Sequence, residues 1–248
     1  SLRLGKLAEM PAEKRSEAIA YKGADAAIAV NRLLKTGKTV TFTLQRDNAV
    51  TANVAARATT QAKSTTLTAL PRIGFYQPWT SNMDEGWTRW VLEQYEFPYT
   101  TLHNADIKAG KLREKFDVLL LADQATNSIL EGNNSRFVRA EYRGGIGADG
   151  LEAIRAFVRD GGILITMGAA CDLAIEKFPI PVRNLKRGLT REQHFAPGTI
   201  VRLQVDQTHP VGLGLPAETY GFYNNSPFFT VLDGFASHRP NVVARYPN

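Results

Sequence analysis

Cysteine is nearly absent from this 248-residue sequence, which contains Cys171 alone. A single cysteine excludes an intrachain disulfide and any zinc site built from several cysteines. It leaves the cellular compartment open, because exported proteins need not contain disulfides. Histidine is also scarce, since the sequence has only His103, His194, His209 and His238. A catalytic base of the histidine type must therefore come from these four.

Long apolar runs are lacking as well. No stretch approaches the roughly 20 residues that a membrane-spanning helix needs, and the N-terminus has no apolar segment followed by a cleavage site. We therefore expect a soluble chain that makes no contact with a membrane. Because the chain ends at Asn248, directly after a predicted strand, we also expect it to be part of a longer protein.

Positive charge predominates but is scattered along the chain. The formal net charge is +6, and such an excess indicates nucleic-acid binding only where it gathers on one face. The densest basic stretch, residues 183–191, contains Asn184, Gly188 and Thr190 and no aromatic side chains for base stacking. It is typical of a solvated loop, so we predict no nucleic-acid partner.

Residues 1–46 predict a small α/β appendage. Five residues recur there at helical spacing: Ala24, Ala27, Ile28, Asn31 and Leu34. Gly37 follows as a helix cap, and residues 38–44 favour a strand. Residues 47–71 are rich in alanine and threonine without clear periodicity, which is typical of a linker or an irregular edge hairpin. With one helix and one strand, the appendage should pack on the main domain or on a missing part.

Residues 72–248 alternate short apolar runs with amphipathic helices, a pattern that predicts a parallel sheet with crossover helices. The predicted strands of this sheet are 73–76, 99–102, 117–121 and 163–167. Further strands at 199–205, 219–222, 228–232 and 242–246 favour antiparallel pairing at one edge. The predicted fold class is therefore α/β, with a doubly wound, mostly parallel, flavodoxin-like sheet after the N-terminal appendage.

The helix that follows the first predicted strand of this domain has clear start signals. Ser81 or Asn82 caps it, and Asp84 and Glu85 lie in its first turn. We predict that its buried stripe consists of Met83, Trp87, Trp90, Val91 and Tyr95.

Polar side chains follow the predicted strands at their carboxyl ends, where open α/β sheets bind ligands. We consider the loops 77–84, 122–126 and 168–176. The candidate ligand-binding residues in them are Gln77, Trp79, Asn82, Asp84, Asp123, Gln124, Asp172 and Glu176. Trp79 gives this polar set an aromatic wall.

The turn at residues 168–172 is similar to the nucleophile elbow of class I glutamine amidotransferases, in which an apolar strand runs into Gly-x-Cys-x-Gly. Aligning Gly168 with the first glycine puts Ala170 at the nucleophile position and Asp172 at the second glycine. Cys171 then falls one residue late. The turn therefore resembles an elbow without its nucleophile.

Other features also weigh against a catalytic cysteine. A register that makes Cys171 the nucleophile puts Ala169 and Leu173 at the glycine positions, where a β-carbon crowds the turn. The neighbouring Asp172 raises the thiol pKa by like charge. The amidotransferase pattern His-x-Glu is absent, which leaves His209 as the best candidate for a base. We interpret the cysteine as a small buried thiol, and keep catalysis by Cys171 and His209 as the alternative.

Longer strings resemble a larger family. They are Tyr76-Gln-Pro-Trp-Thr-Ser-Asn-Met-Asp-Glu-Gly-Trp-Thr-Arg-Trp, Gly168-Ala-Ala-Cys-Asp-Leu-Ala-Ile-Glu, Phe178-Pro-Ile-Pro-Val-Arg-Asn and Thr219-Tyr-Gly-Phe-Tyr-Asn-Asn-Ser-Pro. Together they resemble the C-terminal region of bacterial zinc carboxypeptidase (carboxypeptidase A-like) proteins, which append a glutamine amidotransferase-like domain to a peptidase domain. The resemblance covers most of residues 72–248 and, more loosely, residues 24–40.

This resemblance implies an exported parent protein, periplasmic or extracellular, whose zinc is held by a His-x-x-Glu pair and a third histidine. No histidine here has glutamate three residues later. The resemblance therefore implies zinc only in a peptidase domain outside this sequence, and no metal or cofactor within it. The expected function is a non-catalytic accessory or ligand-binding domain, with the peptidase domain and a small molecule or peptide as partners. The alternative is a cysteine-dependent amidase or hydrolase.

Overall fold

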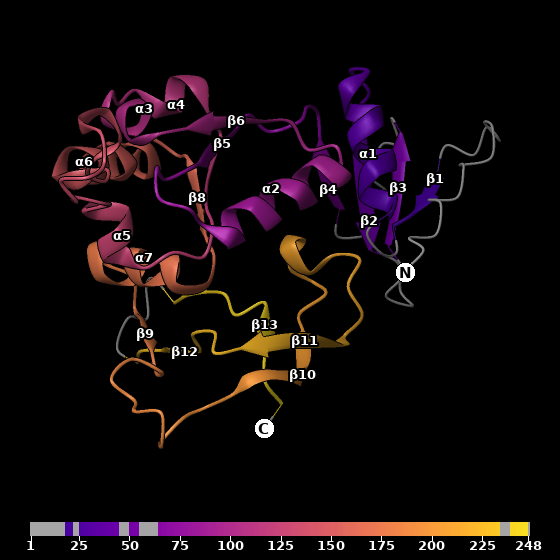
Figure 1. Ribbon diagram of the computed structural model, residues 1–248. Coiled ribbons are helices and arrows are strands. Elements are labelled where there is room, and N and C mark those ends of the chain that lie inside the picture. The colour runs from indigo at the N-terminus through magenta and orange to yellow at the C-terminus, as the bar shows by residue number, and fades with distance from the viewer. Residues whose placement is uncertain (1–17, 22–24, 45–49, 55–63, 234–238, 248) are drawn as a thin grey trace, which may run out of the picture.

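Figure 1 shows the computed structural model, which describes residues 18–21, 25–44, 50–54, 64–233 and 239–247. The chain forms an N-terminal unit, a central parallel α/β domain and small antiparallel sheets near the C-terminus. Within these ranges, every helix is too short or too polar to cross a bilayer.

The N-terminal unit packs one helix, α1 (Asp25–Lys35), on a four-stranded antiparallel sheet. The strands, in the order β1-β3-β2-β4, are Ala18–Ala20, Val50–Val54, Val40–Leu44 and Ser64–Leu67. The predicted helix is confirmed, although Ala24 lies outside the described residues. The interpretation of residues 47–71 as a linker or irregular edge hairpin is wrong, because β3 lies inside the sheet between β1 and β2. Val50 and Ala52 are buried at every second position there, a weak signal among threonine and asparagine.

The central domain is built on a parallel sheet in the order β6-β5-β7-β8. Its strands are β5 (Ile73–Tyr76), β6 (Tyr99–Leu102), β7 (Val118–Leu121) and β8 (Ile163–Thr166). These strands confirm the α/β class and the parallel pairing. The two central strands, β5 and β7, are buried along their whole length, as expected for strands covered on both faces.

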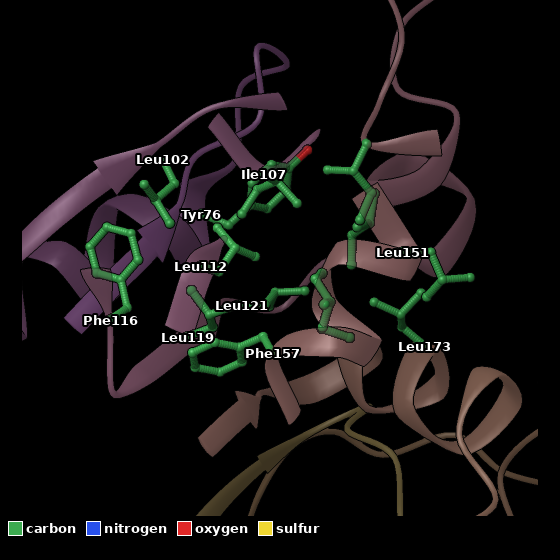
Figure 2. Packing of buried hydrophobic residues seen from close by; sticks show 14 residues of the cluster. Tyr76, Leu102, Ile107, Leu112, Phe116, Leu119, Leu121, Leu151, Phe157 and Leu173 are labelled. Atoms are coloured by element: carbon green, nitrogen blue, oxygen red, sulfur yellow. The ribbon is translucent and has the colours of Figure 1, made fainter. Parts of the chain in front are cut away.

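Most helices of this domain cover one face of the sheet. They are α3 (Asn104–Lys108), α4 (Leu112–Lys115), α5 (Thr126–Leu130), α6 (Gly147–Arg159) and α7 (Cys171–Lys177). Figure 2 shows the core that they form with the sheet, in which Phe157 lies near Leu119 and Leu121, and Leu173 belongs to the same cluster. α2 (Met83–Gln94) covers part of the other face, where Leu92 packs against the cluster of Phe75 and Leu120.

The orientation of α2 differs from the prediction. Asn82 caps the helix as expected, but Met83, Trp87, Trp90 and Val91 are exposed, Met83 by 77% and Trp87 by 59%. The stripe predicted to be buried is therefore wrong for these four residues. The inward positions carry Glu85, Arg89 and Leu92 instead, because Arg89 pairs with Glu85 and lies over the rings of Phe75 and Tyr99.

Strand β8 is also open on the α2 side of the sheet. Ile163 and Ile165 align with Val118 and Leu120 of β7 and share their face, yet both isoleucines are exposed. Leu164 points to the opposite face, against the helical core. We call the exposed side chains of Met83, Trp87, Trp90 and Val91, which share the outer side of α2, the open apolar face.

The C-terminal strands form separate sheets. They are β9 (Val182–Asn184), β10 (Pro197–Val205), β11 (Glu218–Asn224), β12 (Phe229–Val231) and β13 (Ala244–Arg245). Their orders are β11-β10-β13 and β12-β9, and all their pairs are antiparallel. The predicted antiparallel pairing is confirmed, but its predicted place at an edge of the parallel sheet is wrong, since among the described residues these strands pair only with one another.

Helix α1 contacts the end of α2. Asn31 donates a hydrogen bond from Nδ2 to the carbonyl of Tyr95 at 2.8 Å, and Arg32 and Lys35 form ion pairs with Glu96. On another side, Leu213 packs against the core of the N-terminal unit, beyond the short 3-10 turn Pro210–Gly212. The N-terminal unit thus touches both the parallel domain and the segment between β10 and β11.

Candidate functional site

The turn after β8 has its bend at Gly168. Met167 is still extended, Gly168 has a φ of +52°, and Ala170 and Cys171 already have right-handed helical angles. In a nucleophile elbow, the nucleophile occupies the strained residue between strand and helix. That residue here is Gly168, so the predicted alignment, which placed the nucleophile at Ala170, is wrong. Cys171 lies three residues beyond the bend, as the first residue of α7.

Asp123 closes this bend from the facing loop. A β-carbon built on Gly168 would lie 2.0 Å from Asp123 Oδ2, so a side chain cannot be added there without movement. The backbone N–H of Ala169 donates to Asp123 Oδ1 at 2.8 Å. In an elbow, the amide that follows the nucleophile helps to form the oxyanion hole. Here the corresponding amide, that of Ala169, already donates to the Asp123 carboxylate. The turn therefore has neither a nucleophile at Gly168 nor a free amide donor beside it.

Cys171 is held as a thiol. Its Sγ donates to the carbonyl of Thr166 at 3.2 Å and accepts from Thr166 Oγ1 at 3.5 Å. Burial raises the pKa of the Cys171 thiol, and the charges of Asp172 and Asp123 raise it further. A raised pKa is the opposite of what a reactive thiolate needs.

The histidines make contacts elsewhere. His209 accepts from the backbone N–H of Val211, His194 hydrogen-bonds with Tyr223 Oη, and His103 lies beside Gln77. His238 lies outside the described residues. In the described part of the chain, no histidine hydrogen-bonds with Cys171, so the structure does not bring the candidate pair Cys171 and His209 together.

Three cavities lie along the carboxyl ends of the parallel strands. The Trp79 cavity, of about 510 Å³, is lined by Gln77, Pro78, Trp79, Thr80, Ser81, Asn82, Met83, Glu85 and His103. The Asp123 cavity, of about 360 Å³, shares residues 80–83 with it and adds Asp123, Gln124, Ser128 and Gly132. The Glu176 cavity, of about 390 Å³, is lined by Ala125, Thr126, Asn127, Leu130, Glu131, Ala169, Asp172, Glu176, Lys177 and Arg187.

Seven of the eight predicted ligand-binding residues line these cavities. Gln77, Trp79 and Asn82 line the first, Asp123 and Gln124 the second, and Asp172 and Glu176 the third. Asp84 lines none of the three and is exposed in the first turn of α2.

Asn82 joins two of the loops. Its Oδ1 accepts from the backbone N–H groups of Asp84 and Glu85, and its Nδ2 donates to the carbonyl of Asp123 at 3.0 Å. The same side chain therefore caps α2 and fixes the start of this helix against the loop after β7.

Sequence reasoning missed Glu85 and His103 in the Trp79 cavity. The ring of His103 stacks on Trp79, with centroids 3.8 Å apart and planes 9° apart, and Tyr142 lies on the same tryptophan at 4.7 Å. Glu85 is only 5% exposed. The signal for His103 was available, because it directly follows β6, a parallel neighbour of β5 whose carboxyl end reaches the same edge.

The acidic residues of the Glu176 cavity already have partners. Glu176 pairs with Arg187, and Asp172 accepts from Asn184 Nδ2 at 3.0 Å. The buried hydroxyl of Thr126 has no partner among the described residues. Nowhere in the described ranges do three or more histidine, cysteine, aspartate or glutamate side chains gather in a way that could hold a metal ion.

The arrangement of this domain can be compared with known proteins. No family model and no curated protein matches the chain. The solved structure of a protein described as a GMP synthase subunit, from Thermoplasma acidophilum, aligns over 71% of this chain and 73% of its own, with 14% identity and a TM-score of 0.43. A ThuA-like protein from Bacteroides uniformis aligns over 71% and 63%, with 11% identity and a TM-score of 0.35.

The likeness concerns the fold alone at these identities, and the chain spans less than two thirds of the ThuA-like protein.

Proposed function

We propose that this chain is a non-catalytic, ligand-binding accessory domain of an exported zinc carboxypeptidase-like protein. The absence of catalysis is proposed mainly because Asp123 lies against the bend at Gly168. Gly168 stands where an elbow has its nucleophile, and the Asp123 carboxylate accepts from the amide that would help to form the oxyanion hole. The partly buried thiol of Cys171, hydrogen-bonded to Thr166, supports the same proposal.

The ligand-binding part of the proposal is supported by the Trp79 and Asp123 cavities. They lie side by side at the edge of the sheet where α/β proteins bind small molecules. Asn82 holds their common wall in place.

The connection to a peptidase rests on the sequence strings that begin at Tyr76, Gly168, Phe178 and Thr219. The open apolar face supports a role beside another domain, because apolar patches on domain surfaces mark contact sites. Trp87 and Trp90 lie edge to face on it, with centroids 6.1 Å apart. We propose that the peptidase domain of the parent packs on this face, with its zinc site entirely outside this chain.

Turnover measurements test the absence of catalysis. Ammonia release from glutamine and hydrolysis of p-nitrophenyl acetate should be the same for the native chain and for Cys171→Ala. Turnover that is lost in Cys171→Ala would establish the rival function, a cysteine-dependent amidase or hydrolase.

Quenching of tryptophan fluorescence by acrylamide tests the proposed packing. Trp87 and Trp90 should be quenched strongly in this chain and weakly in a longer chain that includes the peptidase domain. Equal quenching in the two chains would overturn the docking proposal.

A further inference from the structure

The Trp79 cavity contains a buried carboxylate with a free oxygen. Glu85 Oε1 accepts from Arg89, while Oε2 has no hydrogen-bond donor among the described residues. Arg89 itself does not line the cavity, because its other contacts are Tyr99 Oη and Thr101 Oγ1, each at 3.0 Å. This oxygen is therefore free to accept a hydrogen bond from a ligand.

His103 presents a second acceptor to the same cavity. Its Nδ1 lies 2.9 Å from the carbonyl of Gln77, which can only accept, so Nδ1 carries the hydrogen. In the neutral ring, Nε2 is then an acceptor, and it too has no partner in the described part of the chain. Both groups can therefore accept a hydrogen bond from a ligand in the cavity.

The rest of the lining favours a cation. Trp79 supplies an indole ring, the aromatic group that attracts cations most strongly. None of the described residues that line the cavity is lysine or arginine. The neighbouring cavity, which shares residues 80–83, adds the carboxylate of Asp123. The two neighbouring cavities thus contain two carboxylates, of which Glu85 is paired with Arg89.

We infer that the Trp79 cavity binds a small organic cation, a ligand with an ammonium or guanidinium group on an apolar or aromatic body. The charged group donates to Glu85 and His103, and the body lies against Trp79. This inference rests on the proposed ligand-binding function and names the chemistry of its ligand.

Three probes of nearly equal shape test the inference in the complete chain: benzylamine, benzyl alcohol and benzoate. Calorimetric titration should show that benzylamine binds about tenfold more tightly than benzyl alcohol, a ratio expected for one charge-assisted hydrogen bond. Benzoate should bind most weakly. Chemical shift changes should centre on Trp79 and His103.

Variants assign the effect to the carboxylate. Glu85→Gln should reduce the affinity for benzylamine about tenfold and leave that for benzyl alcohol unchanged. Glu93→Gln is the matched control, because it removes the same charge from the same helix at an exposed position outside the cavity. It should change neither affinity.

Glu85→Gln also alters the pair with Arg89, so a second variant is needed if that protein unfolds. His103→Phe keeps a ring against Trp79 and removes the acceptor, and should weaken benzylamine binding alone. If benzylamine and benzyl alcohol bind equally tightly, and neither variant changes these affinities, the cavity does not select a cation, although it still binds a ligand. Absence of binding by all three probes would overturn the site itself, whereas the turnover test on Cys171 decides catalysis independently.

Discussion

At the scale of single residues, the bend between β8 and α7 depends on the missing side chain of Gly168. A β-carbon there would meet the Asp123 carboxylate, and a φ of +52° is unfavourable for other residues. Gly168→Ala should therefore lower the free energy of unfolding by at least about 2 kcal/mol. In an Asp123→Ala background, the same change should cost only about 1 kcal/mol, for the backbone angle alone. Urea denaturation of the native protein, the two single variants and the double variant measures this coupling. If the two changes in the free energy of unfolding are additive, Gly168 and Asp123 are not in contact.

The thiol of Cys171 gives a prediction about pH. Burial raises its pKa in the folded protein, so alkylation by iodoacetamide should require a higher pH than for free cysteine, whose pKa is about 8.5. Because the folded state prefers the protonated thiol, stability should also fall as pH rises above that value. Cys171→Ala should remove this part of the pH dependence. Rapid alkylation at pH 7 would indicate a thiolate and contradict the prediction.

At the scale of elements, α2 should tolerate changes on its outer side and resist them on its inner side. Trp87→Gln should change the free energy of unfolding by less than about 0.5 kcal/mol, because this side chain is exposed in the isolated chain. Leu92→Ala should cost about 2 kcal/mol, because it packs against Phe75 and Leu120. Denaturation curves for the two variants decide the orientation, and the reverse order would restore the arrangement predicted from the sequence.

The starts of β5 and β7 are joined by Asp117, which accepts from Arg72 and Arg113. The hydrogen bonds from Arg72 hold the pKa of the Asp117 carboxyl well below its usual range. A lowered pKa stabilises the fold above the unfolded value of about 3.9, and this contribution is lost as pH falls. The urea midpoint should therefore drop between pH 5 and pH 2.5, and less steeply for Asp117→Asn. Parallel curves would show that the contact contributes nothing.

The elements of the parallel domain could be read from the sequence where short apolar runs stand between capping residues. Residues 73–76 and 99–102 were predicted with the bounds that the structure has. The side of α2 that faces the sheet could not be read in this way. Hydrophobic periodicity assumes that the apolar stripe is buried, whereas the buried pair of Glu85 and Arg89 occupies the inner side. The position of the bend was also missed. The elbow pattern places Gly168 where a glycine gives space to the nucleophile, whereas in the structure Gly168 forms the bend itself.

Candidate residues were easier to predict than their contacts. The rule that ligands bind at strand ends located seven residues that line cavities. It could not show that Asp123 accepts from the amide of Ala169, because that contact joins residues far apart in the sequence. Glu85 was likewise assigned only to the first turn of a helix.

At the scale of the whole molecule, the N-terminal unit is joined to the parallel domain by a small contact. Asn31, buried in α1, donates to the carbonyl of Tyr95. Asn31→Ala should cost about 1–2 kcal/mol and weaken the N-terminal unit first. Hydrogen exchange should quicken for amides of β2 and β3 while those of β5 and β7 keep their protection. Equal loss in both units would show that they unfold as one. Arg32→Ala, which removes an exposed ion pair, is the control and should have little effect.

The contact between Gly168 and Asp123 also restricts how the chain can evolve. A cysteine or serine introduced at position 168 would collide with the carboxylate, and loss of that carboxylate alone would supply no nucleophile. Two substitutions must therefore occur together before the turn could begin to resemble a working elbow, and a histidine must still be added. Residues that line the proposed ligand cavities, by contrast, can be substituted one at a time. Under the proposed function, selection would therefore change the ligand of this domain more readily than it would make the domain catalytic.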